Sequence, residues 1–237
     1  MWHREIVGLQ EFEYDNLTGR PPGRFVSAAS RVFRGVREVQ AQVVPYSEAW
    51  QAHNREAIAG DGPLWVALGD SMTVGIGAPA YDRGWVGQVA ATLPLRVVNL
   101  AQSGARVPDV LDRQLPALRT LDEPAVVTLM IGSNDLMSRE YRERLPDGMR
   151  RLLDALPPQT VVSNQPRNSA PALEVNRLID AAIRDRGLHL ADMRGPRTSS
   201  WIGKLAADHY HPNELGYAGI AEVFAEALAE AINRPRG

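Results

Sequence analysis

Residues 64–71 read LWVALGDS, an apolar run of five residues that ends in glycine, aspartate and serine. Apolar residues at both odd and even positions predict a strand that is buried on both faces. Four further short apolar runs follow, and amphipathic stretches of helix length fill the gaps. We predict strands over 64–68, 95–100, 125–131, 160–164 and 188–192, and helices over 85–93, 107–118, 141–156, 171–186 and 213–233. This alternation is typical of a parallel sheet covered on both sides, so we predict a three-layer α/β domain.

The first 63 residues differ from the rest, because they contain no apolar run of strand type. Between Phe25 and Ile58, valines recur at steps of three and four residues, which predicts helix: Val32, Val36, Val39 and Val43. Pro45 should divide this region into two helices. We therefore predict an N-terminal helical extension over 1–63 and a sheet domain over 64–237. The valine stripe lacks the clustered Trp, Phe and Lys of interfacial helices, so we expect it to pack on the domain rather than on a membrane.

The composition excludes several classes of protein. The 237 residues include 26 basic and 28 acidic side chains, for a formal net charge of −2, and no cysteine. The chain therefore lacks the basic excess expected of a nucleic-acid-binding protein, and it has no disulfide, thiolate nucleophile or Cys-ligated zinc. No stretch approaches the ~18 apolar residues of a membrane span. Charged residues stand where a secretory signal would have its apolar core, so we expect a cytoplasmic location.

Polar residues stand directly after the predicted strands, where the functional site of a parallel sheet lies. Ser71 follows the first strand, and its hydroxyl can act as a nucleophile if a base and a residue that orients the base are near. Asp208 and His211 stand three residues apart in a loop after the last strand. Asp208 could hold one ring nitrogen of His211 while the other takes the serine proton. His209 is the competing histidine, because two histidines and an aspartate also suit a metal ion. Without a distant third ligand cluster, we favour the Ser-His-Asp arrangement and predict no metal.

The same strand ends supply donors for a developing oxyanion. Gly104 follows the second strand, and Asn134 follows the third. The backbone N–H groups of Ser71 and Gly104, together with the side-chain amide of Asn134, would give three donors from three strand ends. Singly, Gly104 also fits an ordinary turn, and Asn134 also fits a helix cap. The coincidence of suitable groups at four strand ends favours a catalytic site.

Four short blocks of sequence stand in a characteristic order. They are GDS (69–71), the glycine of SGA (103–105), GSND (132–135), and DHYH (208–211) followed by PNELGY (212–217). With this order and spacing, residues 64–233 resemble the SGNH hydrolases, also called GDSL-type hydrolases. The resemblance implies a flavodoxin-like sheet, the SGNH hydrolase fold. It also implies Ser71 as nucleophile, His211 as base, Asp208 as its partner, and an oxyanion hole of Ser71, Gly104 and Asn134. Met72 stands where the family name has leucine, and residues 1–63 lie outside the resemblance.

The resemblance implies a serine esterase that acts on acyl or acetyl esters through an acyl-enzyme, without a cofactor. Its partner would be a small-molecule, lipid or carbohydrate ester, and we expect no nucleic acid. An acyltransferase that uses the same acyl-enzyme is the first alternative. Two others stay open: an inactive carbohydrate- or lipid-binding module, and a metal-dependent phosphoesterase that uses Asp208, His209 and His211.

Overall fold

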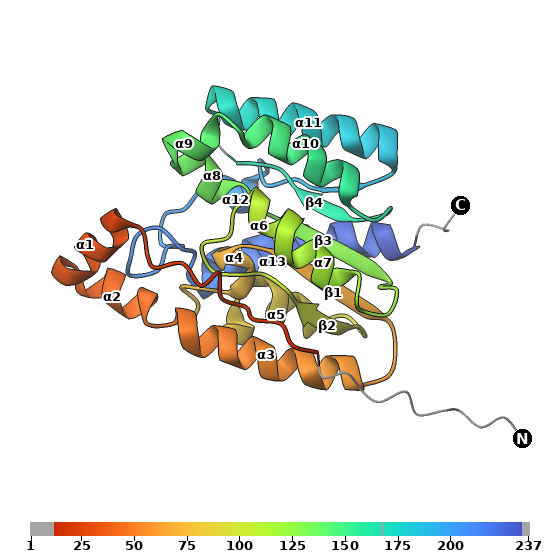
Figure 1. Ribbon diagram of the computed structural model, residues 1–237, viewed down its shortest axis with the longest axis horizontal. Coiled ribbons are helices and arrows are strands. Elements are labelled where there is room, and N and C mark those ends of the chain that lie inside the picture. Colours follow the sequence, from red (N-terminus) through yellow and green to blue (C-terminus); the bar gives the residue numbers. More distant parts are fainter. Residues whose placement is uncertain (1–11, 167, 234–237) are drawn as a thin grey trace, which may run out of the picture.

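The computed structural model describes residues 12–166 and 168–233 (Figure 1). The strands are β1 (Leu64–Gly69), β2 (Arg96–Asn99), β3 (Val126–Met130), β4 (Val161–Ser163) and β5 (His189–Ala191). The N-terminal helices are α1 (Arg24–Val32), α2 (Arg34–Gln40) and α3 (Val43–Ala59). The helices between and after the strands are α5 (Trp85–Ala90), the continuous run α6 (Val107–Asp109), η2 (Val110–Gln114) and α7 (Leu115–Leu118), then α10 (Leu145–Ala155), α11 (Ala170–Arg186) and α13 (Glu214–Asn233). Short helical turns are α4 (Ser71–Val74), η1 (Tyr81–Arg83), α8 (Ser133–Met137), α9 (Arg139–Arg142) and α12 (Pro196–Ser199).

The strands form one parallel sheet in the order β2-β1-β3-β4-β5. Val66 in β1 lies opposite Val98 of β2 and Val127 of β3. All six residues of β1 are buried, as the two-sided apolar run predicts. The direction of winding reverses between β1 and β3, so the carboxyl ends of these strands border the place where α/β sheets bind ligands. The prediction of a parallel α/β sheet is confirmed.

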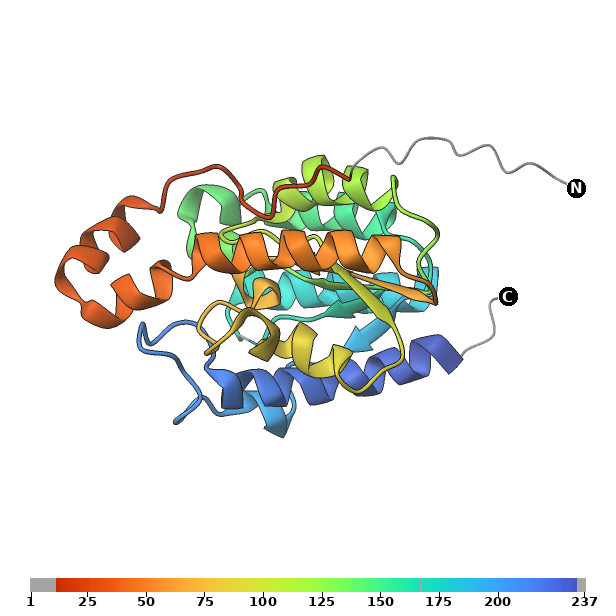
Figure 2. The same ribbon diagram turned by 90° about the horizontal axis from the view of Figure 1, so that it is seen from below.

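Helices cover both faces of the sheet. In Figure 2 the α6–η2–α7 run (lime) lies above the sheet and α13 (blue) lies below it. One core cluster includes Leu68, Val107 and Leu152, and so lies between the sheet and the α6–η2–α7 and α10 helices. The other includes Trp85 of α5 and Phe224 of α13, whose rings stack with centroids 3.9 Å apart. The two clusters make the three layers of the predicted architecture.

The N-terminal helices differ in detail from the expectation. The helical region breaks at Phe33 and again at residues 41–42, so it forms three helices rather than two. Pro45 does not cause the second break. It lies in the first turn of α3, where its missing N–H costs no hydrogen bond. Val39 is buried but Val32 is 74% exposed, so the valine stripe packs on the domain only in its second half.

Helix α3 lies against β2, at the edge of the sheet (Figure 1). Its Trp50 is fully buried and donates a hydrogen bond from Nε1 to Val74 O at 2.9 Å. The division between residues 63 and 64 stays a prediction. Within the described parts of the chain, no helix combines the length and the apolar character that a transmembrane span needs.

Candidate active site

Ser71 directly follows the Gly69-Asp70 pair and is the first residue of α4. Asp70 caps this helix, because its side chain accepts a hydrogen bond from Met72 N at 3.0 Å. Gly77, after α4, has φ +97°, and a Cβ there would lie 2.8 Å from His211 Cβ. Glycine at this position therefore lets the loop of His211 come close to α4. The absence of a side chain at Gly77 thus makes room for His211 beside Ser71.

Ser71, His211 and Asp208 form one unbroken series of contacts. His211 Nε2 lies 2.9 Å from Ser71 Oγ, and His211 Nδ1 lies 2.6 Å from Asp208 Oδ2. An ionised carboxylate can only accept, so Nδ1 carries a proton toward Asp208, and Nε2 of the neutral ring is free to accept from the serine hydroxyl. The side chains are largely buried, with Asp208 8% and His211 16% exposed. The structure thus brings together all three residues of the predicted triad.

The loop around Asp208 holds this carboxylate in its ionised form. Asp208 Oδ1 accepts hydrogen bonds from the backbone N–H groups of Tyr210 and His211, each at 3.0 Å. Burial alone would raise the pKa of Asp208. The hydrogen bond and charge of His211, with the two backbone donors, outweigh burial and hold that pKa below its ordinary value. Asp208 is therefore ionised at neutral pH and places a negative charge next to His211.

His209, the competing histidine, does not join this series of contacts. It has φ +55° and lines a cavity near Tyr210. Across residues 12–166 and 168–233, no group of three His, Cys, Asp or Glu side chains is placed to hold a metal ion. The loop therefore offers a metal ion no complete set of ligands from the described residues.

Gly104 and Asn134 lie on neighbouring segments near the carboxyl end of β1. In the loop after β2, Gln102 N donates a hydrogen bond to Gly69 O at the end of β1, at 3.3 Å. Asn134 Nδ2 donates to Ala105 O at 2.9 Å, so its amide touches the residue next to Gly104. Gly104 is exposed with φ +76°, and no atom lies within 4 Å of the position a Cβ would take. The structure leaves open space at this glycine.

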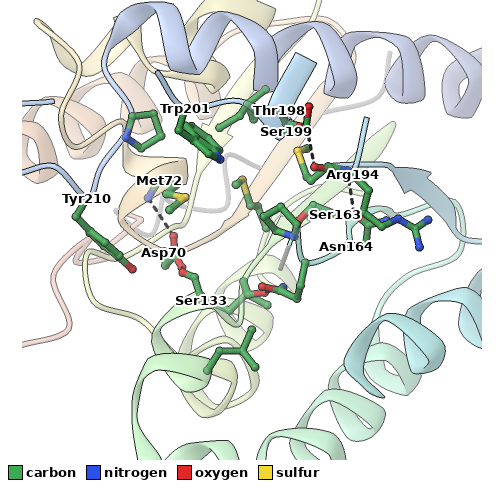
Figure 3. A pocket seen from close by; sticks show the side chains of 18 of the residues that line it. Asp70, Met72, Ser133, Ser163, Asn164, Arg194, Thr198, Ser199, Trp201 and Tyr210 are labelled. Carbon is green, nitrogen blue, oxygen red and sulfur yellow. Dashed lines mark hydrogen bonds between the residues drawn. The ribbon is translucent and has the colours of Figure 1, made fainter. Parts of the chain in front are cut away.

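A cavity of about 610 Å³ lies near the carboxyl ends of the strands (Figure 3), and residues next to Ser71, Asn134 and His211 in the sequence line it rather than those three residues themselves. Asp70 and Met72, on either side of Ser71 in the sequence, line it together with Tyr210. Much of the remaining wall is apolar: Met130, Ile131, Leu136, Met193, Trp201, Leu205 and Ile220. Polar groups line it at the ends of β4 and β5, with Asn164 and Arg194 labelled in Figure 3. The wall therefore combines apolar side chains with polar groups, as small-molecule sites commonly do.

Two buried carboxylates near the site escaped the sequence analysis. Asp70 is 2% exposed and accepts a hydrogen bond from Ser133 Oγ at 2.8 Å, and burial raises its pKa above the ordinary value. Asp135 accepts from Val107 N, at 3.2 Å for its nearer oxygen, and burial raises its pKa to about 6. Their adjacency to Ser71 and Asn134 was the available signal, but sequence gives no measure of burial.

The comparisons with known proteins agree with this geometry. The GDSL-like Lipase/Acylhydrolase family matches residues 67–218, which is more than half of the chain. The chain belongs to this family. As a GDSL-like hydrolase it is an SGNH-type ester hydrolase, and the family resemblance predicted from its sequence is confirmed. No protein with a curated description matches the chain.

Solved structures with the same fold include an extracellular lipase from Streptomyces rimosus, with 22% identity and a TM-score of 0.52 over 70% of this chain and 100% of that one. A psychrotrophic esterase from Pseudoalteromonas sp. has 19% identity and a TM-score of 0.59 over 73% and 100%. A salicylyl-acyltransferase from a tetracycline biosynthetic pathway has 20% identity and a TM-score of 0.57 over 73% and 56%. At these identities the likeness establishes the fold of this GDSL-like hydrolase.

Proposed function

We propose that the chain hydrolyses carboxylic esters through an acyl-enzyme on Ser71, with His211 as general base and Asp208 as the residue that orients the base. The main support is the pair of short contacts, 2.9 Å from Ser71 to His211 and 2.6 Å from His211 to Asp208. These distances lie within the hydrogen-bond reach that proton transfer requires. This order of contacts supports the three proposed roles.

In the first half-reaction, Ser71 Oγ attacks the carbonyl carbon while its proton passes to His211 Nε2. The tetrahedral intermediate then collapses: the bond between carbon and the alcohol oxygen breaks, and His211 returns the proton to the leaving alcohol. In the second half-reaction, water attacks the acyl carbon and gives a proton to His211. The acid is released when the bond to Ser71 Oγ breaks and the serine recovers its proton. Asp208 stays ionised and stabilises the imidazolium in both halves.

Three donors are proposed for the oxyanion: Ser71 N–H, Gly104 N–H and the side-chain amide of Asn134. Ser71 is the first residue of α4, so its N–H has no carbonyl partner within that helix. An asparagine amide has two N–H groups, and the bond of Asn134 to Ala105 O occupies one of them. The open space at Gly104 lets a substrate approach its backbone. Donors fixed in place before the reaction stabilise the negative charge as it develops.

The cavity that Asp70 and Met72 line supports an ester with an aliphatic group as the substrate. The apolar side chains of its wall, among them Met130, Ile131 and Trp201, can pack against a hydrocarbon group of the substrate. Hydrolysis of p-nitrophenyl esters from acetate to palmitate, alongside acetylated sugars, tests this point. We expect the rate to rise from acetate to chains of medium length, and acetylated sugars to react slowly. A preference for acetylated sugars would contradict the proposed substrate class.

Acyl transfer is the second candidate, because the same acyl-enzyme can react with an alcohol in place of water. The fold is shared with an acyltransferase as well as with lipases and esterases. Product analysis of one ester, with and without an added alcohol or sugar acceptor, separates the two activities. We expect the free acid as the main product in both cases.

The test of the triad compares matched variants. Ser71→Ala should abolish ester hydrolysis and labelling by a fluorophosphonate, whereas the exposed Ser200→Ala should leave both unchanged. A phosphonate is a suitable probe, since the Pseudoalteromonas esterase was solved inhibited by monoethylphosphonate. His211→Ala should be nearly as damaging as Ser71→Ala. His209→Asn should cost far less, and asparagine tolerates the positive φ of that position. Retention of activity in Ser71→Ala would overturn the proposal.

A further inference from the structure

Residues 14–20, which lie before the region matched by the family, run beside the loop at 99–104 that carries Gly104. In Figures 1 and 2 this segment (red) crosses the molecule next to α3 before it enters α1. It donates hydrogen bonds to five carbonyl oxygens of the loop. They run from Asn16 Nδ2 to Asn99 O (2.8 Å) and Ala101 O (2.9 Å), from Tyr14 Oη to Leu100 O (2.6 Å), from Thr18 Oγ1 to Ser103 O (3.4 Å), and from Arg20 Nη2 to Gly104 O (3.1 Å).

The loop also donates back to this segment. Gln102 Nε2 donates to Asp15 O at 2.7 Å and to Leu17 O at 2.9 Å, and Leu17 pairs with Ser103 in a parallel β-bridge. Asn16 is fully buried. A buried set of paired polar groups is rigid, because each broken bond would leave an unpaired group away from water. The bonds of Asn16 and Gln102 therefore hold the two segments together.

Arg20 holds the end of this loop in a second way. Its guanidinium forms a bidentate salt bridge with Asp109, at 2.7 Å from Nη1 to Oδ1 and 2.6 Å from Nη2 to Oδ2. Asp109 is 8% exposed and also accepts from Arg106 N at 2.7 Å. Arg20 thus links Gly104 O to α6. A planar bidentate salt bridge of this kind fixes both the direction and the distance of the guanidinium.

Helix α3 supports the segment from the other side. Ser47 Oγ donates to Asn16 O at 3.2 Å. Asn54 Nδ2 donates to Asn99 O at 2.8 Å, and Asn54 Oδ1 accepts from Asn99 N at 2.8 Å. These side chains are all buried. The N-terminal segment is therefore held between α3 and the loop at 99–104.

We propose that residues 14–20 position the Gly104 N–H for the oxyanion, with Arg20 as the main positioning residue. The proposal rests on the proposed function, in which Gly104 is an oxyanion donor. A peptide unit is planar, so Ser103 O and Gly104 N–H point in opposite directions. The bond from Thr18 to Ser103 O acts on that plane directly, but at 3.4 Å it is long. The bond from Arg20 to Gly104 O is 3.1 Å long, and Asp109 anchors Arg20. It fixes the following plane and so limits the rotation of the Gly104 backbone, on which the direction of the Gly104 N–H depends. Gly104 itself has no side chain to restrain it.

The energetic consequence concerns the transition state. Removing one oxyanion donor costs about 10²–10³ in kcat, and misplacing a catalytic group by about 1 Å costs up to about 10². Arg20→Ala leaves the donor in place but loosens it, so we expect kcat to fall about tenfold to 100-fold. KM should stay within twofold, because the bond to the oxyanion forms only in the transition state.

The experiment measures kcat and KM for a small p-nitrophenyl ester in the full chain, with active sites counted by complete fluorophosphonate titration. Arg20→Ala is compared with Arg20→Lys. Lysine keeps the positive charge but cannot form the bidentate salt bridge, so this variant should recover part of kcat. Thr18→Val is a milder variant, with an expected loss of a few-fold. The control is Arg150→Ala, which removes an exposed pair with Asp147 (2.8 Å) on α10 and should behave as the wild type. Thermal melting reports the fold of each variant.

Three outcomes overturn the proposal. If Arg20→Ala lowers the melting temperature but keeps wild-type kcat per titrated site, Arg20 only supports the fold. If KM rises while kcat is unchanged, Arg20 contacts the substrate. If Arg20→Ala does not fold and Thr18→Val keeps wild-type kcat, the segment does not orient the donor. Failure of the proposed function is distinguishable, because it requires Ser71→Ala to remain active whatever the Arg20 variants do.

Discussion

Replacing Asp208 by asparagine changes one heavy atom, removes a negative charge and should reverse the hydrogen bonding of His211. Asp208 Oδ1 accepts from two backbone N–H groups, those of Tyr210 and His211, at 3.0 Å each. An asparagine side chain has only one acceptor oxygen, and we expect it to accept the two backbone hydrogen bonds. Its NH₂ group then faces His211 Nδ1, where the carboxylate oxygen now lies at 2.6 Å. His211 must accept at Nδ1 and carry its proton on Nε2, so it cannot take the proton of Ser71.

The size of the effect follows from those contacts. If the amide turned so that its oxygen accepted from His211 Nδ1–H again, the two backbone hydrogen bonds would break, at about 0.5–1.5 kcal/mol each. The NH₂ group would then face the backbone N–H groups of Tyr210 and His211, which is unfavourable because donors face donors. A cost of about 2–3 kcal/mol leaves roughly one molecule in 30 to 150 with the correct tautomer. The variant also loses the negative charge that stabilises the imidazolium. Together these effects should lower kcat by about 10³–10⁴, in line with the loss known for a serine-protease triad with this change.

The assay is kcat for p-nitrophenyl acetate in Asp208→Asn, with thermal melting to show that the fold persists. The matched control is Asp147→Asn, since Asp147 is exposed and its pair with Arg150 lies on α10. The pKa of Asp208 lies below its ordinary value, so the comparison can be made at any pH from about 5 upward with the wild-type carboxylate ionised. A variant that keeps more than about a tenth of kcat would refute the argument from the two backbone donors.

Two further predictions concern the residues after β3. Asn134→Ala should lower kcat by about 10²–10³ with little change in KM, the pattern of a lost oxyanion donor, and a rise in KM alone would instead mark Asn134 as a substrate contact. Asp135→Asn should stabilise the protein at pH 7 but not at pH 4. Burial raises the pKa of Asp135 from 3.8 to about 6. The folded state therefore binds more protons than the unfolded state between these values, and stability falls as pH rises through them. Urea denaturation should show a gain of at most about 3 kcal/mol at pH 7, and equal gains at both pH values would contradict this reasoning.

The sheet could be predicted closely from sequence. Each strand begins and ends within one residue of its predicted range. The reason is that a parallel strand covered on both faces must be apolar at every position, as β1 is, and such runs are short and distinct. The candidate site could be placed for a related reason. Ser71 and Asn134 stand at carboxyl ends of strands, and the topology of a doubly wound sheet brings those ends together.

The N-terminal helices were harder to predict, because periodicity reports which residues share a helix face but not whether another surface covers that face. Val32 and Val39 are equally apolar, yet Val32 is 74% exposed and Val39 only 5%. Pro45 misled the prediction for a similar reason. A proline breaks a helix in its interior but is accommodated in the first turn, and the sequence alone did not show where α3 begins.

The contacts of residues 14–20 are harder still to predict from the sequence. Most of the acceptors are backbone carbonyls, which every residue has. The donors are Tyr, Asn, Thr and Arg, residue types that a sequence analysis assigns to an exposed turn. Deleting residues 1–63 would remove Asn54 as well as this segment, so Asn99 O would lose both of its side-chain donors. Unpaired carbonyls in a buried loop are costly, and the loop would have to move toward water to satisfy them. Such a movement would displace Gly104, so we expect a chain that begins at the first strand of the sheet to lose the proposed oxyanion donor.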